Sequence, residues 1–145
     1  NDLDIAYYQT GSDNLGRAVC ENDGYNCTGP ATILDAERTA YFMAILARSP
    51  NLRVIGVDTE VATDVFDAAE DLRNDGILSA TDVARLEEHT AYSTEGWPFH
   101  HHHMHVSWNW EDGHSGLGIW TPPARCGVDY ATVDRPTKAL PAIFH

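Results

Sequence analysis

Apolar and polar residues alternate along two segments of the chain, residues 2–8 and 104–110. A period of two residues predicts a β-strand in each segment. Near the second segment the alternation places His103 and His105 on one face, because side chains i and i+2 of a strand point the same way. A third strand is predicted over 52–58, where the sequence reads Leu-Arg-Val-Ile-Gly-Val-Asp and is rich in β-branched residues.

Between these strands, apolar residues recur at helical spacing. Residues 31–48 predict a helix that Pro50 ends. A second helix is predicted over 60–73, and a third begins at Ser79 as its N-cap and runs to about residue 89. The residues expected on the buried faces are Leu34, Tyr41 and Ile45 in the first helix, and Val61, Val65, Ala68 and Leu72 in the second.

The order strand, helix, strand, helix, helix, strand predicts an α+β fold. We expect a small antiparallel sheet that carries the functional site, flanked by two or three helices. Beyond Trp110 the sequence is rich in Gly and Pro, which predicts a long irregular C-terminal segment with one short strand at most, at 116–120. No second domain boundary is visible, so residues 1–145 are predicted to form a single domain.

The charge balance restricts the partners. The chain carries 22 Asp and Glu against 9 Lys and Arg, a formal net charge of −13. Such an acidic surface repels phosphate backbones and anionic lipid head groups, so we exclude nucleic acid and membrane surfaces as partners. Membrane insertion is excluded as well, because no run of about 18 apolar residues is present.

The three cysteines indicate the redox environment. Cys20 and Cys27 enclose a short polar loop that a disulfide closes easily, which leaves Cys126 as a free thiol or as the partner of a cysteine outside this sequence. A Cys-x-x-Cys pair is absent, which disfavours a thiolate zinc site. A disulfide indicates an oxidising compartment.

Five of the eight histidines lie within residues 100–105. An expression tag would lie at a terminus, whereas this cluster is internal and leads directly into a predicted strand. On one strand face, His103 and His105 would be roughly 7 Å apart, so that one could bind a metal ion while the other reaches a metal-bound water. Asp2 and Asp4 share a face of the first strand in the same way. A carboxylate from there could complete a site, because catalytic zinc commonly has three protein ligands and a water.

Two motifs of this chain resemble the penicillin-insensitive murein endopeptidase family, which belongs to the wider group of lysostaphin-like and D-Ala-D-Ala metallopeptidases. The motifs are Asn-Asp-Leu-Asp-Ile at 1–5 and His-Met-His-Val at 103–106. The family pattern is His-x-x-Gly-x-Asp-x-Asp early in the chain, followed by His-x-His on a late strand. The resemblance implies that Asp4 and His105 are zinc ligands. It also implies that His103 assists the catalytic water and the transition state, and that His100 has an accessory role.

The resemblance implies a zinc-dependent peptidoglycan endopeptidase in the periplasm or outside the cell. Its Zn²⁺ would activate a water that cleaves peptide cross-links involving D-alanine, so the partner is a peptidoglycan peptide. The family's first zinc ligand falls upstream of Asn1. We therefore expect residues 1–145 to be a single metallopeptidase-like domain that lacks its N-terminal part, a missing segment of the same protein. The abrupt first strand and the start without Met agree with this expectation.

Other functions stay open at this stage. The histidines of residues 100–105 could chelate nickel, copper or zinc in a non-catalytic metal-binding module, or they could simply be solvated. A cupin-type oxygenase would need a Glu closer to the His-x-His than Glu111. Serine hydrolase chemistry lacks its Gly-x-Ser-x-Gly motif. The four tryptophans are expected in the core rather than in a groove, from their tendency to be buried: Trp97, Trp108, Trp110 and Trp120.

Overall fold

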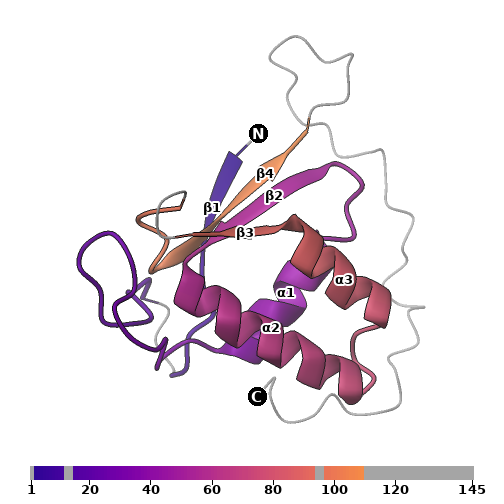
Figure 1. Ribbon diagram of the computed structural model, residues 1–145, viewed down its shortest axis with the longest axis horizontal. Helices are drawn as coiled ribbons and strands as arrows, with labels where there is room; N and C mark the ends of the chain where they lie inside the picture. The colour runs from indigo at the N-terminus through magenta and orange to yellow at the C-terminus, as the bar shows by residue number, and fades with distance from the viewer. Residues whose placement is uncertain (1, 12–14, 94–96, 110–145) are drawn as a thin grey trace. The chain divides into compact units, whose positions relative to one another are not determined.

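The computed structural model describes residues 2–11, 15–93 and 97–109 (Figure 1). Contacts divide the chain into two units, Asn1–Trp110 and Glu111–His145, and every described residue belongs to the first. The predictions of an irregular C-terminal segment, of a short strand within it and of a free or externally paired Cys126 concern residues outside those that the structure describes.

Three helices and four strands in this part of the chain confirm the α+β class. In order they are β1 (Asp2–Ala6), α1 (Ala36–Leu46), β2 (Leu52–Val57), α2 (Thr59–Asn74), α3 (Ala80–His89), β3 (Thr90–Tyr92) and β4 (His103–Trp108). No helix among these is long and apolar enough to cross a membrane.

The sheet is mixed, with the strand order β1-β4-β2-β3. β4 pairs antiparallel with β1 and with β2, whereas β2 and β3 are parallel. The prediction of an antiparallel sheet was therefore wrong for one pair of strands. The chain leaves β2 through α2 and α3 and returns beside β2 in the same direction, which is the helical crossover that parallel strands require. The three residues of β3 are too few to show an alternating pattern.

The helices cover one face of the sheet (Figure 1). The sheet contributes Ile55, Val57, Met104 and Val106 to the core on that face, and each is fully buried. Side chains at the intervening positions of β4 point the other way. The face of the sheet opposite the core therefore carries the polar side chains of β4.

The helix predictions were confirmed in position and corrected in detail. All four expected residues of α2 are buried, and Ser79 caps α3 in a capping box with Asp82. The first helix begins at Ala36 rather than near residue 31, because the Asp35 side chain accepts the Arg38 N–H at 3.1 Å and caps it there. Its expected buried face was confirmed only in part. Leu34 is buried but precedes the helix, while Tyr41 and Ile45 are only half-buried. The buried residues of α1 itself are Thr39, Ala40, Met43 and Ala44.

The strand boundaries shift by one or two residues. β1 ends at Ala6, two residues earlier than expected, and Tyr7 beyond it is buried. β4 begins at His103 and ends at Trp108, so the first histidine of the His-x-His motif belongs to the strand. Cys20 and Cys27 form the expected disulfide.

Candidate functional site

The two motifs at opposite ends of the described chain meet on adjacent strands. Because β1 and β4 pair antiparallel, Asp4 lies opposite His105, and Ala6 lies opposite His103. The distance from His105 Nδ1 to Asp4 Oδ1 is 2.8 Å, and His103 Nε2 lies 3.7 Å from the same oxygen. One carboxylate oxygen therefore faces both imidazoles of the His-x-His motif.

His105 lies between two carboxylates. Its Nε2 is 3.4 Å from Asp2 Oδ1, whereas its Nδ1 is the nitrogen next to Asp4. The hydrogen bond from His105 lowers the pKa of Asp4, and a hydrogen bond from the Ser107 hydroxyl is the largest cause of the lowered pKa of Asp2. Both carboxylates are therefore ionised at neutral pH, and they surround His105 with negative charge that favours a bound cation.

The side chain of His103 is 18% exposed and that of His105 is 27% exposed, so His103 is the more enclosed member of the His-x-His motif. Burial lowers the pKa of His103 to about 4, with further lowering from the nearby His100 and His102. The imidazole is therefore neutral around pH 7, and it keeps a nitrogen lone pair available to accept a proton.

His100 presents an unpaired ring nitrogen to the group. Its Nδ1 lies 2.7 Å from the carbonyl oxygen of Pro98 and 3.2 Å from that of Trp97, so in the neutral ring this nitrogen carries the hydrogen and donates it. Nε2 is then the lone-pair nitrogen, and it is buried without a hydrogen-bond partner among the described residues. The His100 ring centroid lies 4.8 Å from that of His103 and 6.1 Å from that of His105.

Trp97 forms an aromatic wall of the site, although the sequence predicted it in the core. Its ring centroid is 5.8 Å from His105 and 5.3 Å from His100. The indole lies directly on Gly56, which pairs with His105 across the sheet, and a Cβ at Gly56 would overlap the ring. A glycine within a β-branched strand is a signal of such close approach, and it identifies Gly56 as a residue that permits this wall.

The donor set fits part of a zinc site. Carboxylate oxygen and imidazole nitrogen are ordinary zinc ligands, and two tetrahedral ligands at about 2.0 Å from a metal lie roughly 3.3 Å apart. The 2.8 Å between His105 Nδ1 and Asp4 Oδ1 is close to that spacing. Within residues 2–11, 15–93 and 97–109, however, no three His, Cys, Asp or Glu side chains are placed to hold one ion. Among the described residues, Asp4 and His105 are therefore a pair of adjacent donor groups and not a complete metal site.

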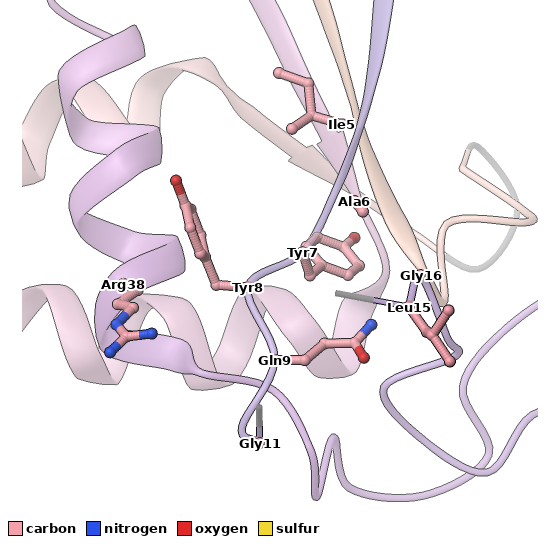
Figure 2. A pocket seen from close by; sticks show the side chains of 9 residues that line it. All are labelled: Ile5, Ala6, Tyr7, Tyr8, Gln9, Gly11, Leu15, Gly16 and Arg38. Atoms are coloured by element: carbon pink, nitrogen blue, oxygen red, sulfur yellow. The ribbon is translucent and has the colours of Figure 1, made fainter. Parts of the chain in front are cut away.

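A separate pocket of about 450 Å³ lies beyond the end of β1 (Figure 2). It is lined by Ile5, Ala6, Tyr7, Tyr8, Gln9, Gly11, Leu15, Gly16 and Arg38. None of Asp4, His100, His103 and His105 contributes to this lining. The candidate site therefore lies on the open face of the sheet, outside this pocket. The two are connected through Ala6, the strand partner of His103, and through Tyr7, whose hydroxyl lies 2.8 Å from the carbonyl oxygen of His100.

Comparison of the chain with protein-family models, with curated proteins and with solved structures finds no match. The case for a function therefore depends on the two motifs and on the side chains that the fold brings together.

Proposed function

We propose that this protein is a zinc-dependent peptidoglycan endopeptidase that cleaves peptide cross-links involving D-alanine. The observation that carries the proposal is the pairing of Asp4 with His105 on adjacent strands, with His103 on the same face of the sheet. The Cys20–Cys27 disulfide supports an oxidising location, in the periplasm or outside the cell.

Asp4 and His105 would hold the metal ion, and a third protein ligand would come from outside the described residues. Zinc, when bound, supplies Lewis-acid activation of a water and of the scissile carbonyl. Asp2 would act on His105 from its other side as a hydrogen-bond acceptor, which is how outer carboxylates orient ligating imidazoles.

His103 would move the proton. Its neutral imidazole can accept a proton from the attacking water, and the resulting imidazolium can donate a hydrogen bond to the oxyanion of the tetrahedral intermediate. His100 would have an accessory role next to His103, because the two ring centroids lie 4.8 Å apart and the nearby His100 contributes to the lowered pKa of His103.

Digestion of cross-linked peptidoglycan tests the proposal, with the released peptides separated and identified by mass spectrometry. We expect the full-length protein to cut the cross-links. His103→Ala should lower turnover at least about 100-fold, the usual contribution of a general base, while zinc stays bound. His89→Ala is the matched control, because His89 ends α3 and is not part of the site; it should leave turnover unchanged. Full turnover by His103→Ala would contradict the assigned role.

A non-catalytic histidine-rich metal-binding module is the second candidate. It is favoured by the succession of imidazoles along the segment, since His101 and His102 have ring centroids 4.7 Å apart and His102 Nε2 lies 3.2 Å from His103 Nδ1. This function predicts bound metal without peptide cleavage. It also predicts that each histidine substitution lowers the metal affinity by a similar, additive amount.

A further inference from the structure

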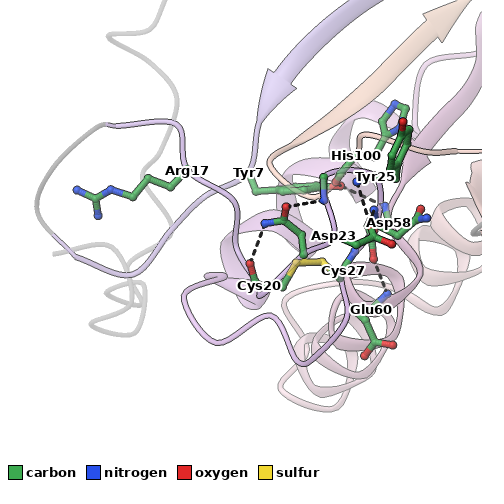
Figure 3. The surroundings of a disulfide bond; sticks show 12 residues. Tyr7, Arg17, Cys20, Asp23, Tyr25, Cys27, Asp58, Glu60 and His100 are labelled. Carbon is green, nitrogen blue, oxygen red and sulfur yellow. Dashed lines mark hydrogen bonds between the residues drawn. A yellow bond between two sulfur atoms is a disulfide. The ribbon is translucent and has the colours of Figure 1, made fainter.

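The histidine segment is fastened to the loop that the Cys20–Cys27 disulfide closes (Figure 3). Phe99 N–H donates to the carbonyl oxygen of Tyr25, and the two rings pack with centroids 4.8 Å apart. The N–H of Val19, next to the first cysteine, donates to the carbonyl oxygen of His101 at 2.8 Å. Backbone hydrogen bonds thus join the two segments at both ends of the loop.

A second connection runs through two buried side chains. The Tyr7 hydroxyl donates to the carbonyl oxygen of His100 at 2.8 Å, and it lies 3.4 Å from the Asp58 N–H, which donates to it. Asp58 Oδ2 accepts the Cys27 N–H at 2.8 Å, while its Oδ1 accepts the Glu60 N–H and caps α2. Tyr7 is 4% exposed and Asp58 is 3% exposed, so water cannot substitute for these bonds.

The Tyr7 hydroxyl is a suitable hydrogen-bond donor to the carbonyl oxygen of His100. It is a donor to His100 only while it keeps its proton, and burial raises the pKa of Tyr7, so the hydroxyl stays protonated at neutral pH. Its position just after β1 places it between the strand that carries Asp4 and the segment that carries His100.

The segment needs such support because its backbone is strained. Phe99 has φ of 69°, in the left-handed region that disfavours a side chain with a Cβ, and its ring is half exposed. A residue in that conformation persists only when its surroundings hold it there. The bonds to Tyr25, Tyr7 and Val19 are the contacts that do so.

We propose that Tyr7 and Asp58 are positioning residues that connect the disulfide loop to the backbone of His100. They thereby hold the His100 ring where its Nδ1 reaches the carbonyl oxygens of Pro98 and Trp97, which fix the ring orientation and tautomer. The importance of this connection for catalysis rests on the proposed function. The connection itself does not, because the tautomer of His100 can be measured without metal or substrate.

Nitrogen-15 NMR of the histidine side chains tests the proposal, in metal-free protein at about pH 8.5, where an ordinary imidazole is neutral. The wild-type protein should show His100 with its hydrogen on Nδ1. Tyr7→Phe removes only the hydroxyl and should give a mixture of tautomers at His100. Ser79→Ala, which removes the cap of α3, is the control for a general loss of stability and should keep the wild-type signal. A wild-type signal in Tyr7→Phe would overturn the proposal.

Reduction of the wild-type disulfide with a phosphine is an independent test of the proposal, because it does not require a substituted protein to fold. We expect the same His100 signal change as in Tyr7→Phe, and an unchanged signal in a protein that remains folded would contradict the link to the disulfide loop.

If the proposed function holds, Tyr7→Phe should also lower kcat about tenfold with KM unchanged, as loss of outer support for a metal site does. Absence of zinc and of turnover in the wild type would contradict the proposed function, while the NMR result would still decide whether Tyr7 positions His100.

Discussion

Asp4 Oδ1 accepts a hydrogen bond from His105 Nδ1 at 2.8 Å, although 101 positions separate the two residues in the chain. The antiparallel pairing of β1 with β4 creates this contact, and it places His103 within 3.7 Å of the same oxygen. The carboxylate of Asp4 and the imidazole of His105 are adjacent donors of the kind that zinc takes, and the His103 imidazole lies beside them. Substitution of Asp4 in β1 and substitution of His105 in β4 should therefore lower the same property, the affinity of the protein for zinc.

Removing the second carboxylate should weaken metal binding without abolishing it. Asp2 Oδ1 is 3.4 Å from His105 Nε2, so Asp2→Asn removes a negative charge and an oriented acceptor beside the proposed ligand. We expect the zinc affinity to fall about tenfold, the effect typical of an outer partner. A zinc titration against a competing chelator measures it. Glu88→Gln makes the same charge change on the exposed side of α3, and an equal effect of both variants would contradict a specific role of Asp2.

Gly56 and Trp97 should behave as a coupled pair. Gly56→Ala places a Cβ inside the space of the Trp97 indole, and overpacking of this kind costs about 1–3 kcal/mol of unfolding free energy. In a Trp97→Ala background the same substitution should cost far less, because the obstructing ring is absent. Urea unfolding of the four proteins gives the coupling energy. Additive effects of the two substitutions would show that Trp97 does not lie on Gly56 in solution.

Asp82 should make the fold sensitive to acid. It accepts hydrogen bonds from the Arg48 guanidinium at 2.8 and 3.0 Å and from the backbone of Ser79, and the Arg48 hydrogen bond is the largest cause of its lowered pKa. A depressed folded-state pKa means that the stabilisation is complete above the unfolded value of 3.8 and is lost as the pH falls below it. Asp82→Asn should cost about 1–3 kcal/mol at pH 7.

That cost should shrink as the pH falls below 3.8, because Asp82 of the unfolded wild-type chain then takes up a proton that the folded protein does not yet bind, and this proton uptake favours unfolding. Urea unfolding of both proteins at pH 7 and at several values below about pH 4 measures the difference. A difference that stays constant throughout would exclude Asp82 as an acid-sensitive group.

Much of the fold could be predicted from periodicity, because the pattern reports which face of an element is buried. It placed Val61, Val65, Ala68 and Leu72 on the core face of α2, and Ser79 at the start of α3. It could not place β3 or the parallel pairing, since a three-residue strand is defined by its neighbour rather than by its own sequence. The face of α1 was predicted only in part, because the most buried positions of this helix are Thr39, Ala40, Met43 and Ala44, whereas Tyr41 and Ile45 are half-buried.

The residues of the candidate site were named from the sequence, but only part of their arrangement could be predicted. The two-residue period of β4 was enough to put His103 and His105 on one face. Asp4 was expected beside them from the family resemblance, and the pairing of β1 with β4 places it opposite His105. Trp97 and Tyr7 were not predictable as site residues, because one is placed by the missing side chain of Gly56 and the other by hydrogen bonds between distant segments. Contacts of this kind produce no periodic pattern of residues in the sequence.

Zinc content of the full-length protein is the most direct measurement of the central claim that Asp4 and His105 hold a catalytic metal ion. Metal analysis after purification without chelator should give one zinc per chain for the wild type and for Glu88→Gln. Asp4→Asn and His105→Ala should lose the metal, with an affinity at least about 100-fold lower, since a direct ligand contributes no less than an outer one. Equal zinc in all four proteins, or no zinc in the wild type, would contradict the claim.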